Sequence, residues 1–547
     1  MTLLSACAAS QPTTRAEAAF TPTGAIGDYL AGRYALSHGD YAVAANNLLK
    51  AVAADPGHHS DVILEAFIAC VNAGRPEAVS LAKQLPNSQV AQLVLADVDI
   101  KAGHWQAAEE KFHALPRQGV TQFLQPLLVA WSQAGEGRTD TALATLRPYI
   151  EATRLRPIFA LHAALIADIG NKTADAQTLY GIAQAGLNEP NLRLVQMLAS
   201  WQARQGQPAE AQRTLASLPG VAPDLSIAMP ALLANVINRP VPDAADGIAE
   251  TYFTFAAMLR AQDQNDFALV ILQLALDLRP DFSAARLVAA DILQNQGQPG
   301  SALRMLTDVP SHDALMPVVR LRRAALQARL GHTEEALHDL QQMAQDYPDS
   351  PLPDEQLGDM LRAKQKFPEA VAAYSKAIAR ITDPAPSDWV LFYDRGVSLE
   401  QSHEWPKALA DFEQALKLSP NQPFVLNYLG YSWADRGHHL DQARQMIERA
   451  AQIRPNDGAI TDSLGWVMFR QGDYRDAVKT LEKAVELEPE DATINGHLGD
   501  AYWAVGRKIE AQYQWRRALT MHPAPEDAAK LEAKLSGNHG GAVVSNP

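Results

Sequence analysis

The sequence is poor in cysteine, in positive charge and in long apolar runs, and each shortage excludes a class of protein. Cys7 and Cys70 are the two cysteines among 547 residues, too few for a disulfide framework or a four-thiolate zinc site. Lys and Arg number 47 against 62 Asp and Glu, which gives a net charge of −15 and disfavours nucleic acid as a partner, because phosphate is repelled. No apolar run reaches the roughly 18 residues of a membrane-spanning helix.

Motifs that carry chemistry are also missing. The chain has no Gly-x-x-x-x-Gly-Lys-Ser/Thr phosphate loop, no His-Glu-x-x-His and no Gly-x-Ser-x-Gly. The pairs His58-His59 and His438-His439 fall in predicted turns, and no cysteine or spaced carboxylate completes a metal site at either pair. We therefore expect no catalytic residue, no cofactor and no metal, and we predict that the protein is not an enzyme.

What the chain does have is an internal repeat. Prolines that follow helical segments recur at the same position of a 34-residue period. The repeats start at 249, 283, 317 and 351, each 34 residues after the one before. Four extra residues near Asp383 move the next start to 389, and the remaining starts are 423, 458 and 492. Eight repeats therefore cover 249–525. A fixed period of this length is typical of a repeat architecture.

Each repeat carries the same pattern of small and apolar residues. In the repeat that starts at 458, Gly465 is at position 8, Gly472 at 15, Ala477 at 20 and Pro489 at 32. Small residues at positions 8 and 20 let two helices approach closely, and the glycine at 15 permits a tight turn. The proline ends the second helix. The pattern resembles the tetratricopeptide repeat (TPR), a helix–turn–helix unit that must stack on its neighbours.

The predicted fold is all-α, a TPR superhelical solenoid of antiparallel helix pairs in two segments with a joint. Residues 25–58 form one clear repeat, and 25–222 as a whole contain looser pairs with turns near Gly74, Gly103, Gly135, Gly170 and Gly206. Generic helical hairpins remain an alternative in this part. Four prolines in 223–248 interrupt the repeat period, and we interpret this segment as the joint between the two repeat segments. Residues 526–547 are predicted to be the end of a helix and a disordered tail.

A binding face is predicted on the first helix of the later repeats. Positions 5, 9 and 12 share one side of that helix, rotated away from the packing stripe, and in the TPR family this side lines the groove that holds partner segments. The predicted groove residues here are Tyr393, Asn427, Tyr431, Asp462, Trp466, Phe469, Arg470, Asp500 and Trp503. Aromatic residues mixed with polar groups favour protein binding. Position 5 carries no lysine, which disfavours the carboxylate-clamp type of groove.

The N-terminus suggests a lipid anchor. Leu4-Ser5-Ala6-Cys7 resembles the lipobox of bacterial lipoproteins, and this resemblance implies that Cys7 is lipidated and that 1–24 form a flexible tether. Only six residues precede Cys7, fewer than a signal peptide needs, so we expect the true start to lie upstream. The alternative is a chance match in a cytoplasmic protein.

The later repeats are also similar to a narrower family. Leu426 to Trp433, Asp462 to Trp466 and Gly496 to Trp503 resemble the C-terminal repeats of proteobacterial outer-membrane TPR lipoproteins, one of which is an adaptor for a periplasmic processing protease. This resemblance implies a non-catalytic scaffold in the periplasm that recruits envelope proteins, including a protease and its substrates. A cytoplasmic TPR co-factor or assembly protein, or a TPR-linked enzyme, remains the alternative.

Overall fold

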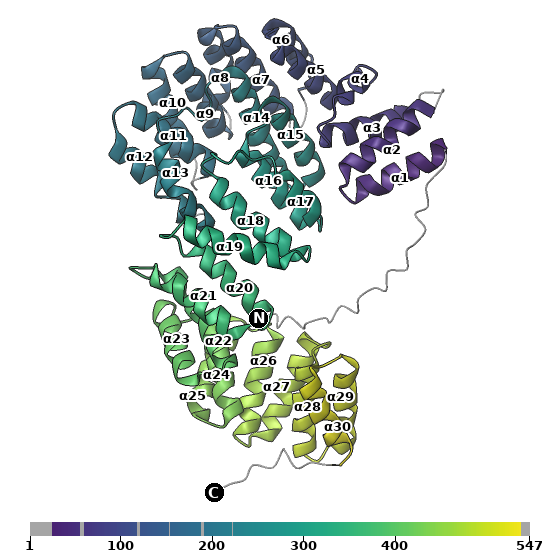
Figure 1. The fold of residues 1–547 in the computed structure, drawn as a ribbon, viewed down its shortest axis with the longest axis vertical. Helices are drawn as coiled ribbons and strands as arrows, with labels where there is room; N and C mark the ends of the chain where they lie inside the picture. The colour runs from purple at the N-terminus through teal and green to yellow at the C-terminus, as the bar shows by residue number, and fades with distance from the viewer. Residues whose placement is uncertain are drawn as a thin grey trace. The chain divides into compact units, whose positions relative to one another are not determined.

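The computed structural model describes residues 24–54, 60–117, 121–152, 154–186, 191–220 and 222–537, and within these ranges every regular element is a helix (Figure 1). The predicted all-α fold is confirmed. The described residues form two compact units, one ending at Pro353 and the other beginning at Asp354. Cys7, the rest of the predicted tether to residue 23, and 538–547 of the predicted tail lie outside the described residues.

The N-terminal unit is built from antiparallel helix pairs. Its helices are α1 (Ala25–Ser37), α2 (Tyr41–Ala54), α3 (Ser60–Asn72), α4 (Glu77–Ala82), α5 (Gln89–Lys101), α6 (Trp105–His113), α7 (Thr121–Gly135), α8 (Thr139–Ala152), α9 (Arg156–Ile169), α10 (Thr173–Gly186), α11 (Leu192–Arg204), α12 (Pro208–Leu215), η1 (Leu218–Gly220), η2 (Pro223–Ala228), α13 (Met229–Ala234), α14 (Ala244–Arg260), α15 (Asn265–Leu278), α16 (Ser283–Asn295), α17 (Pro299–Met305), α18 (Met316–Arg329) and α19 (Thr333–Asp346).

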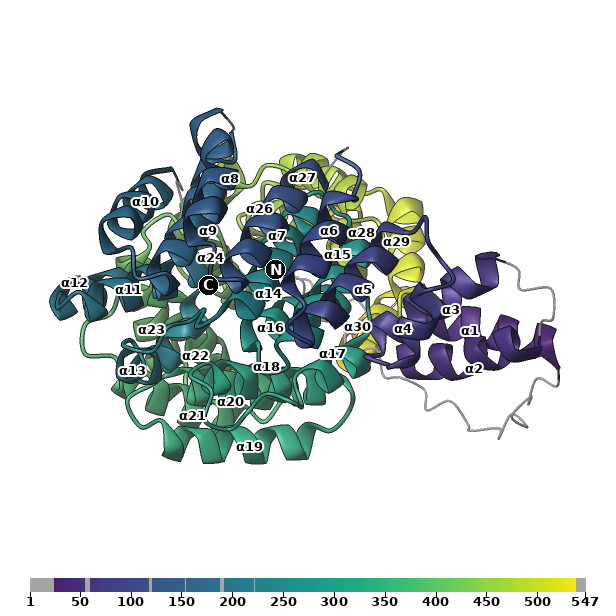
Figure 2. The ribbon, with the colours of Figure 1, turned by 90° about the horizontal axis from the view of Figure 1, so that it is seen from above.

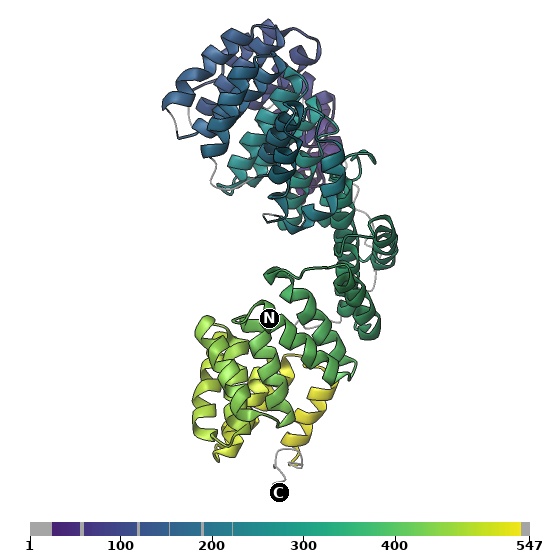
Figure 3. The same ribbon diagram turned by 90° about the vertical axis from the view of Figure 1, so that its left-hand side faces the viewer.

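The C-terminal unit continues the same alternation, visible from green to yellow in Figure 3. Its helices are α20 (Leu352–Ala363), α21 (Phe367–Ala379), η3 (Pro386–Asp388), α22 (Trp389–Gln401), α23 (Trp405–Leu418), α24 (Pro423–Arg436), α25 (Leu440–Ile453), α26 (Gly458–Arg470), α27 (Tyr474–Leu487), α28 (Ala492–Ala504), α29 (Lys508–Thr520) and α30 (Pro525–Leu535).

The first helices of the repeats begin where the period places them. Helices α16, α18, α20, α22, α24, α26 and α28 start at 283, 316, 352, 389, 423, 458 and 492, within one residue of the predicted starts. The first predicted start, 249, lies inside α14, which begins five residues earlier at Ala244. The 34-residue spacing therefore corresponds to helical hairpins over nearly the whole predicted array.

Glycine at position 8 lets the two helices of a hairpin approach closely. A Cβ added at Gly465 would lie 2.5 Å from Leu481, and one at Gly499 would lie 2.4 Å from Trp515. The turn glycine Gly472 has φ of +88°, a left-handed conformation that side-chain-bearing residues rarely adopt. Both roles assigned to glycine from the pattern are confirmed in this hairpin.

Two of the predicted turns of the N-terminal unit have their left-handed residue just after the glycine that marked them. The left-handed residue is Gly137 rather than Gly135, and Asn171 rather than Gly170. Gly135 instead ends α7 against Trp105, where a Cβ would lie 2.4 Å from the indole ring. The turns therefore lie near the predicted glycines, and Gly135 itself provides a close helix contact.

The N-terminal unit folds back on itself. Helices α14 and α15 pack against α3, α5, α7 and α9 (Figure 2). The Tyr252 hydroxyl donates a 2.8 Å hydrogen bond to the buried carboxylate of Asp97, 155 residues earlier, and a Cβ added at Gly247 would lie 2.3 Å from Trp131. Residues 223–248 lie inside this unit, and whether they also act as a joint between repeat segments stays a prediction.

No helix in the described part of the chain is both long enough and apolar enough to cross a membrane.

Candidate protein-binding cavity

A cavity of about 1250 Å³ lies within the C-terminal unit. Its wall is formed by the end of α22, by the first helices α24, α26 and α28 of three consecutive repeats, and by α30. The residues on this wall include Glu400, Asn427, Tyr431, Asp435, Arg436, Asp462, Trp466, Phe469, Arg470, Asp491, His497, Asp500, Trp503, Asp527, Lys530, Leu531 and Lys534.

Local sequence signals fix the helices that carry these residues. Asp457 caps the start of α26 by accepting a 3.1 Å hydrogen bond from the backbone of Ile460, and Asp491 caps α28 in the same way at 2.9 Å from Ile494. The close glycine contacts hold each first helix against its second helix. The opposite side of the first helix is therefore left to face the cavity.

An aromatic stack forms part of the wall. The indole of Trp466 lies between the rings of Phe469 and His497, with ring centroids 5.0 and 4.1 Å away and planes within 14° of parallel. Tyr431 lies beside the imidazole, at 6.3 Å between centroids. Residues from three repeats thus make one continuous apolar and aromatic surface.

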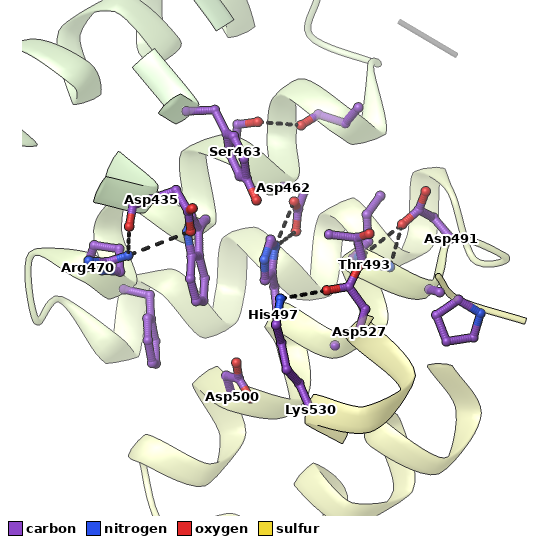
Figure 4. A pocket seen from close by; sticks show the side chains of 18 of the residues that line it. Asp435, Asp462, Ser463, Arg470, Asp491, Thr493, His497, Asp500, Asp527 and Lys530 are labelled. Atoms are coloured by element: carbon purple, nitrogen blue, oxygen red, sulfur yellow. Dashed lines mark hydrogen bonds and ion pairs between the residues drawn. The ribbon is translucent and has the colours of Figure 1, made fainter. Parts of the chain in front are cut away.

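His497, one of the rings of this stack, forms a buried pair with Asp462. The imidazole Nδ1 lies 2.9 Å from Asp462 Oδ2, and Figure 4 shows the two side chains pointing toward each other. Burial lowers the pKa of His497, but the charge and hydrogen bond of Asp462 and the charge of Asp500 outweigh it, so the pKa is raised above its usual value. The imidazole therefore favours its charged form beside the carboxylate.

Asp500 holds the last helix in place. Its carboxylate accepts hydrogen bonds from the indole of Trp515 at 3.0 Å and from the ammonium of Lys534 on α30 at 2.7 Å. Leu531 of α30 packs into the core cluster that contains Trp515. This predicted groove residue therefore lines the cavity while its ion pair with Lys534 maintains the position of α30.

The structure brings together eight of the nine predicted groove residues, namely Asn427, Tyr431, Asp462, Trp466, Phe469, Arg470, Asp500 and Trp503. Tyr393 does not line the cavity. It packs in a core cluster, 6.1 Å from Phe412 and 5.7 Å from Tyr428 between ring centroids. The binding of a partner by the eight residues stays a prediction.

Sequence reasoning missed His497 and the residues of α30. His497 stands at position 6 of its repeat, beside the stripe at 5, 9 and 12, and could have been included as a flanking position. Lys530, Leu531 and Lys534 lie after the last full repeat, where the 34-residue period gives no signal. Within the described ranges no group of three or more His, Cys, Asp or Glu side chains is placed to hold a metal ion.

The helical hairpins and their shared inner wall define a two-helix solenoid. Comparison with known families agrees, since residues 242–391 match the model for a tetratricopeptide repeat-like domain, 389–422 that for the tetratricopeptide repeat and 465–506 that for the TPR repeat. These parts of the chain are tetratricopeptide repeats. The chain's narrower resemblance to outer-membrane TPR lipoproteins stays a prediction.

Curated relatives share the repeats over part of their length. A TPR repeat-containing protein of Pseudomonas aeruginosa is 27% identical over 221 residues, which are 40% of this chain and 36% of that protein. The aspartyl/asparaginyl beta-hydroxylase of Mus musculus is 27% identical over 197 residues, 34% of this chain and 26% of the hydroxylase. The chain therefore spans between a quarter and just over a third of these relatives.

Solved structures of similar fold include the Cut9–Hcn1 hetero-tetramer of the APC/C and the yeast Tom70. The first has a TM-score of 0.38 at 15% identity and covers 93% of this chain and 95% of its own. The second has a TM-score of 0.35 at 13% identity and covers 94% of this chain and 95% of its own.

Proposed function

We propose that the protein is a non-catalytic scaffold and that the cavity of the C-terminal unit holds a segment of a partner protein. The observation that carries the proposal is the cavity wall itself. Three consecutive repeats and α30 contribute to one concave surface, on which aromatic rings alternate with polar groups. Such a mixture of anchoring aromatic side chains and polar contacts is the composition of protein-binding surfaces.

The test compares two aromatic substitutions. Trp466→Ala removes the centre of the aromatic stack, whereas Tyr513→Ala removes a ring that is 63% exposed on α29 and does not line the cavity. Each full-length variant is immobilised and used to capture proteins from an extract of the source cells. We expect Trp466→Ala to lose partners that the wild type and Tyr513→Ala retain. Identical partners for all three proteins would contradict the proposal, provided that circular dichroism shows equal helix content.

A narrower form of the proposal concerns location. The lipobox resemblance at Cys7 supports a protein anchored by lipid in the outer membrane and facing the periplasm, where it would bring an envelope protease to its substrates. Mass spectrometry of the mature N-terminus tests this location directly. A diacylated N-terminal cysteine is the expected result, and an unmodified chain that retains residues before Cys7 would favour the cytoplasmic alternative.

A further inference from the structure

We infer that the cavity selects an extended internal segment of its partner that carries a basic side chain, and that it does not select a free C-terminal carboxylate. This inference rests on the proposed function and adds the chemistry of the bound segment. It follows from the charges on the cavity wall, from two buried polar atoms that lack partners, and from the size of the cavity.

Every lysine and arginine on the cavity wall is already paired with a carboxylate. The pairs are Arg436 with Glu400, Arg470 with Asp435, Lys530 with Asp527 and Lys534 with Asp500. A terminal carboxylate or an acidic side chain of a ligand would have to displace one of these carboxylates to gain a cation. The wall therefore offers no ready site for negative charge.

Negative charge on the wall is in excess and partly open to solvent. The wall carries six carboxylates against four lysines and arginines and the imidazole of His497, which pairs with Asp462. Asp435 and Asp527 have side chains that are 58% and 55% exposed, and the carboxylate of Asp435 lies 3.8 Å from the guanidinium of Arg470. Arg470 and Lys530 already contact these two carboxylates, and a lysine or arginine of a bound segment can join each exposed carboxylate without breaking the buried pairs. The charge complementarity therefore favours a basic segment.

Two polar atoms on the wall have no hydrogen-bond partner among the described residues. They are the side-chain carbonyl oxygen of Asn427, a residue only 6% exposed, and the ring nitrogen of Trp466. The oxygen of Asn427 can accept a hydrogen bond from a backbone N–H group, and the ring nitrogen of Trp466 can donate one to a backbone C=O group. These are the two groups that an extended backbone offers. Both atoms are already shielded from water, so a small movement of the wall that admits a backbone amide gains a bond with no further cost for desolvating these two atoms.

The size of the cavity also favours a polypeptide. Pockets for small molecules hold roughly 300–1,000 Å³, whereas this cavity measures about 1250 Å³ and extends over helices from three repeats and α30. An extended segment can place its backbone near Asn427 and Trp466 and a basic side chain near Asp435 or Asp527 at the same time. A C-terminal carboxylate has no counterpart in this arrangement.

The experiment uses two phage libraries of random dodecapeptides on the full-length protein. In one library the peptide is joined to the coat protein at both ends, and in the other its C-terminus is free. We expect enrichment from the first library of peptides in which Lys and Arg outnumber Asp and Glu. Binding of an enriched synthetic peptide, measured by fluorescence anisotropy, should weaken by about tenfold in Trp466→Phe, which keeps a ring in the stack but removes the donor.

Matched charge variants separate the cavity from general electrostatics. Asp527→Asn removes an exposed carboxylate of the wall, and Asp476→Asn removes one on α27 that does not line the cavity. Both carboxylates form i,i+3 pairs with a lysine at 2.9 Å. Binding of the basic peptide should fall severalfold in Asp527→Asn and in Asp435→Asn, and should stay unchanged in Asp476→Asn.

Several results would overturn the inference. They are enrichment of acidic peptides, enrichment of free C-termini, or no enrichment above phage without a peptide. Stronger enrichment after deletion of residues 538–547 would identify the chain's own tail as the occupant and would also overturn it. If partner capture still depended on Trp466 in any of these cases, the proposed function would stand and only the basic internal segment would be rejected.

Discussion

At the scale of single residues, His497 is the buried group of the cavity whose charge depends on pH near neutrality. Its pKa in the folded chain is raised above the usual value by Asp462, so folding favours the protonated ring. The stabilisation is fully present below the unfolded pKa of about 6.5 and is lost as pH rises through the folded pKa. The charged groups that face the ring are Asp462, Asp500 and Lys534.

We predict that His497→Gln removes this pH dependence. The glutamine amide can still donate to Asp462 but cannot titrate. The difference in melting temperature between wild type and His497→Gln should be largest near pH 6 and should shrink toward pH 9, on a scale of about 2–4 °C for each kcal/mol. Scanning calorimetry at several pH values measures it. A difference that stays constant or grows with pH would contradict the assigned charge state.

Spacing along one helix predicted most of the cavity residues, because positions 5, 9 and 12 follow the helical period and share a face. The prediction that Tyr393 lines the groove was wrong, because its side chain packs in the core beside Phe412 and Tyr428. No sequence pattern within a single repeat reveals this, because the orientation depends on the bulk of neighbouring aromatic residues. Lys534 was missed for a different reason, since it belongs to a helix outside the repeat.

At the scale of elements, each hairpin depends on a small residue where its two helices cross. We predict that Gly465→Ala destabilises the α26–α27 hairpin by about 1–3 kcal/mol, because the new methyl group would lie 2.5 Å from Leu481 and overpack the crossing. Alanine has the higher helix propensity, which offsets up to about 1 kcal/mol of this cost. The melting temperature should therefore fall.

Gly181 in α10 is the matched control for this substitution. It also lies inside a helix, but a Cβ there would meet nothing within 4 Å. Gly181→Ala should therefore stabilise the chain by about 0.5–1 kcal/mol through helix propensity alone. If both substitutions stabilised the protein, close approach at position 8 would not be the reason for the glycine.

The last helix, α30, is held by few contacts. Leu531, which is 5% exposed, packs on the cluster around Trp515, and Lys534 pairs with Asp500. We predict that Leu531→Ala raises amide hydrogen exchange in 525–535 strongly, because truncation of a buried leucine costs about 2–5 kcal/mol. Lys530→Ala, at a side chain that is 68% exposed, should leave exchange nearly unchanged. Equal exchange in the two variants would mean that α30 is anchored elsewhere.

The positions of the hairpins could be predicted because glycine, proline and alanine recur at fixed positions in each repeat and mark where its helices begin and end. The packing of α14 and α15 against α3, α5, α7 and α9 could not be predicted in this way. Contacts such as Tyr252 with Asp97 join segments 155 residues apart, and the pattern of a repeat specifies only its neighbours.

At the scale of the whole molecule, the chain divides into two compact units at Pro353 and Asp354. The buried clusters around Trp515, Phe412 and Ile447 belong to the C-terminal unit, while Trp131, Tyr180 and Tyr252 are buried in the N-terminal unit. Since each unit has its own buried core, we predict that calorimetry of the full chain resolves two unfolding transitions rather than one.

The two glycine variants assign these transitions. Gly181→Ala lies in the N-terminal unit and should raise one melting temperature, whereas Gly465→Ala lies in the C-terminal unit and should lower the other. Each substitution should leave the second transition unchanged, because sites without shared contacts act independently. A single transition that both variants shift would mean that the repeats unfold as one cooperative stack. In that case the division of contacts after Pro353 would have no thermodynamic counterpart.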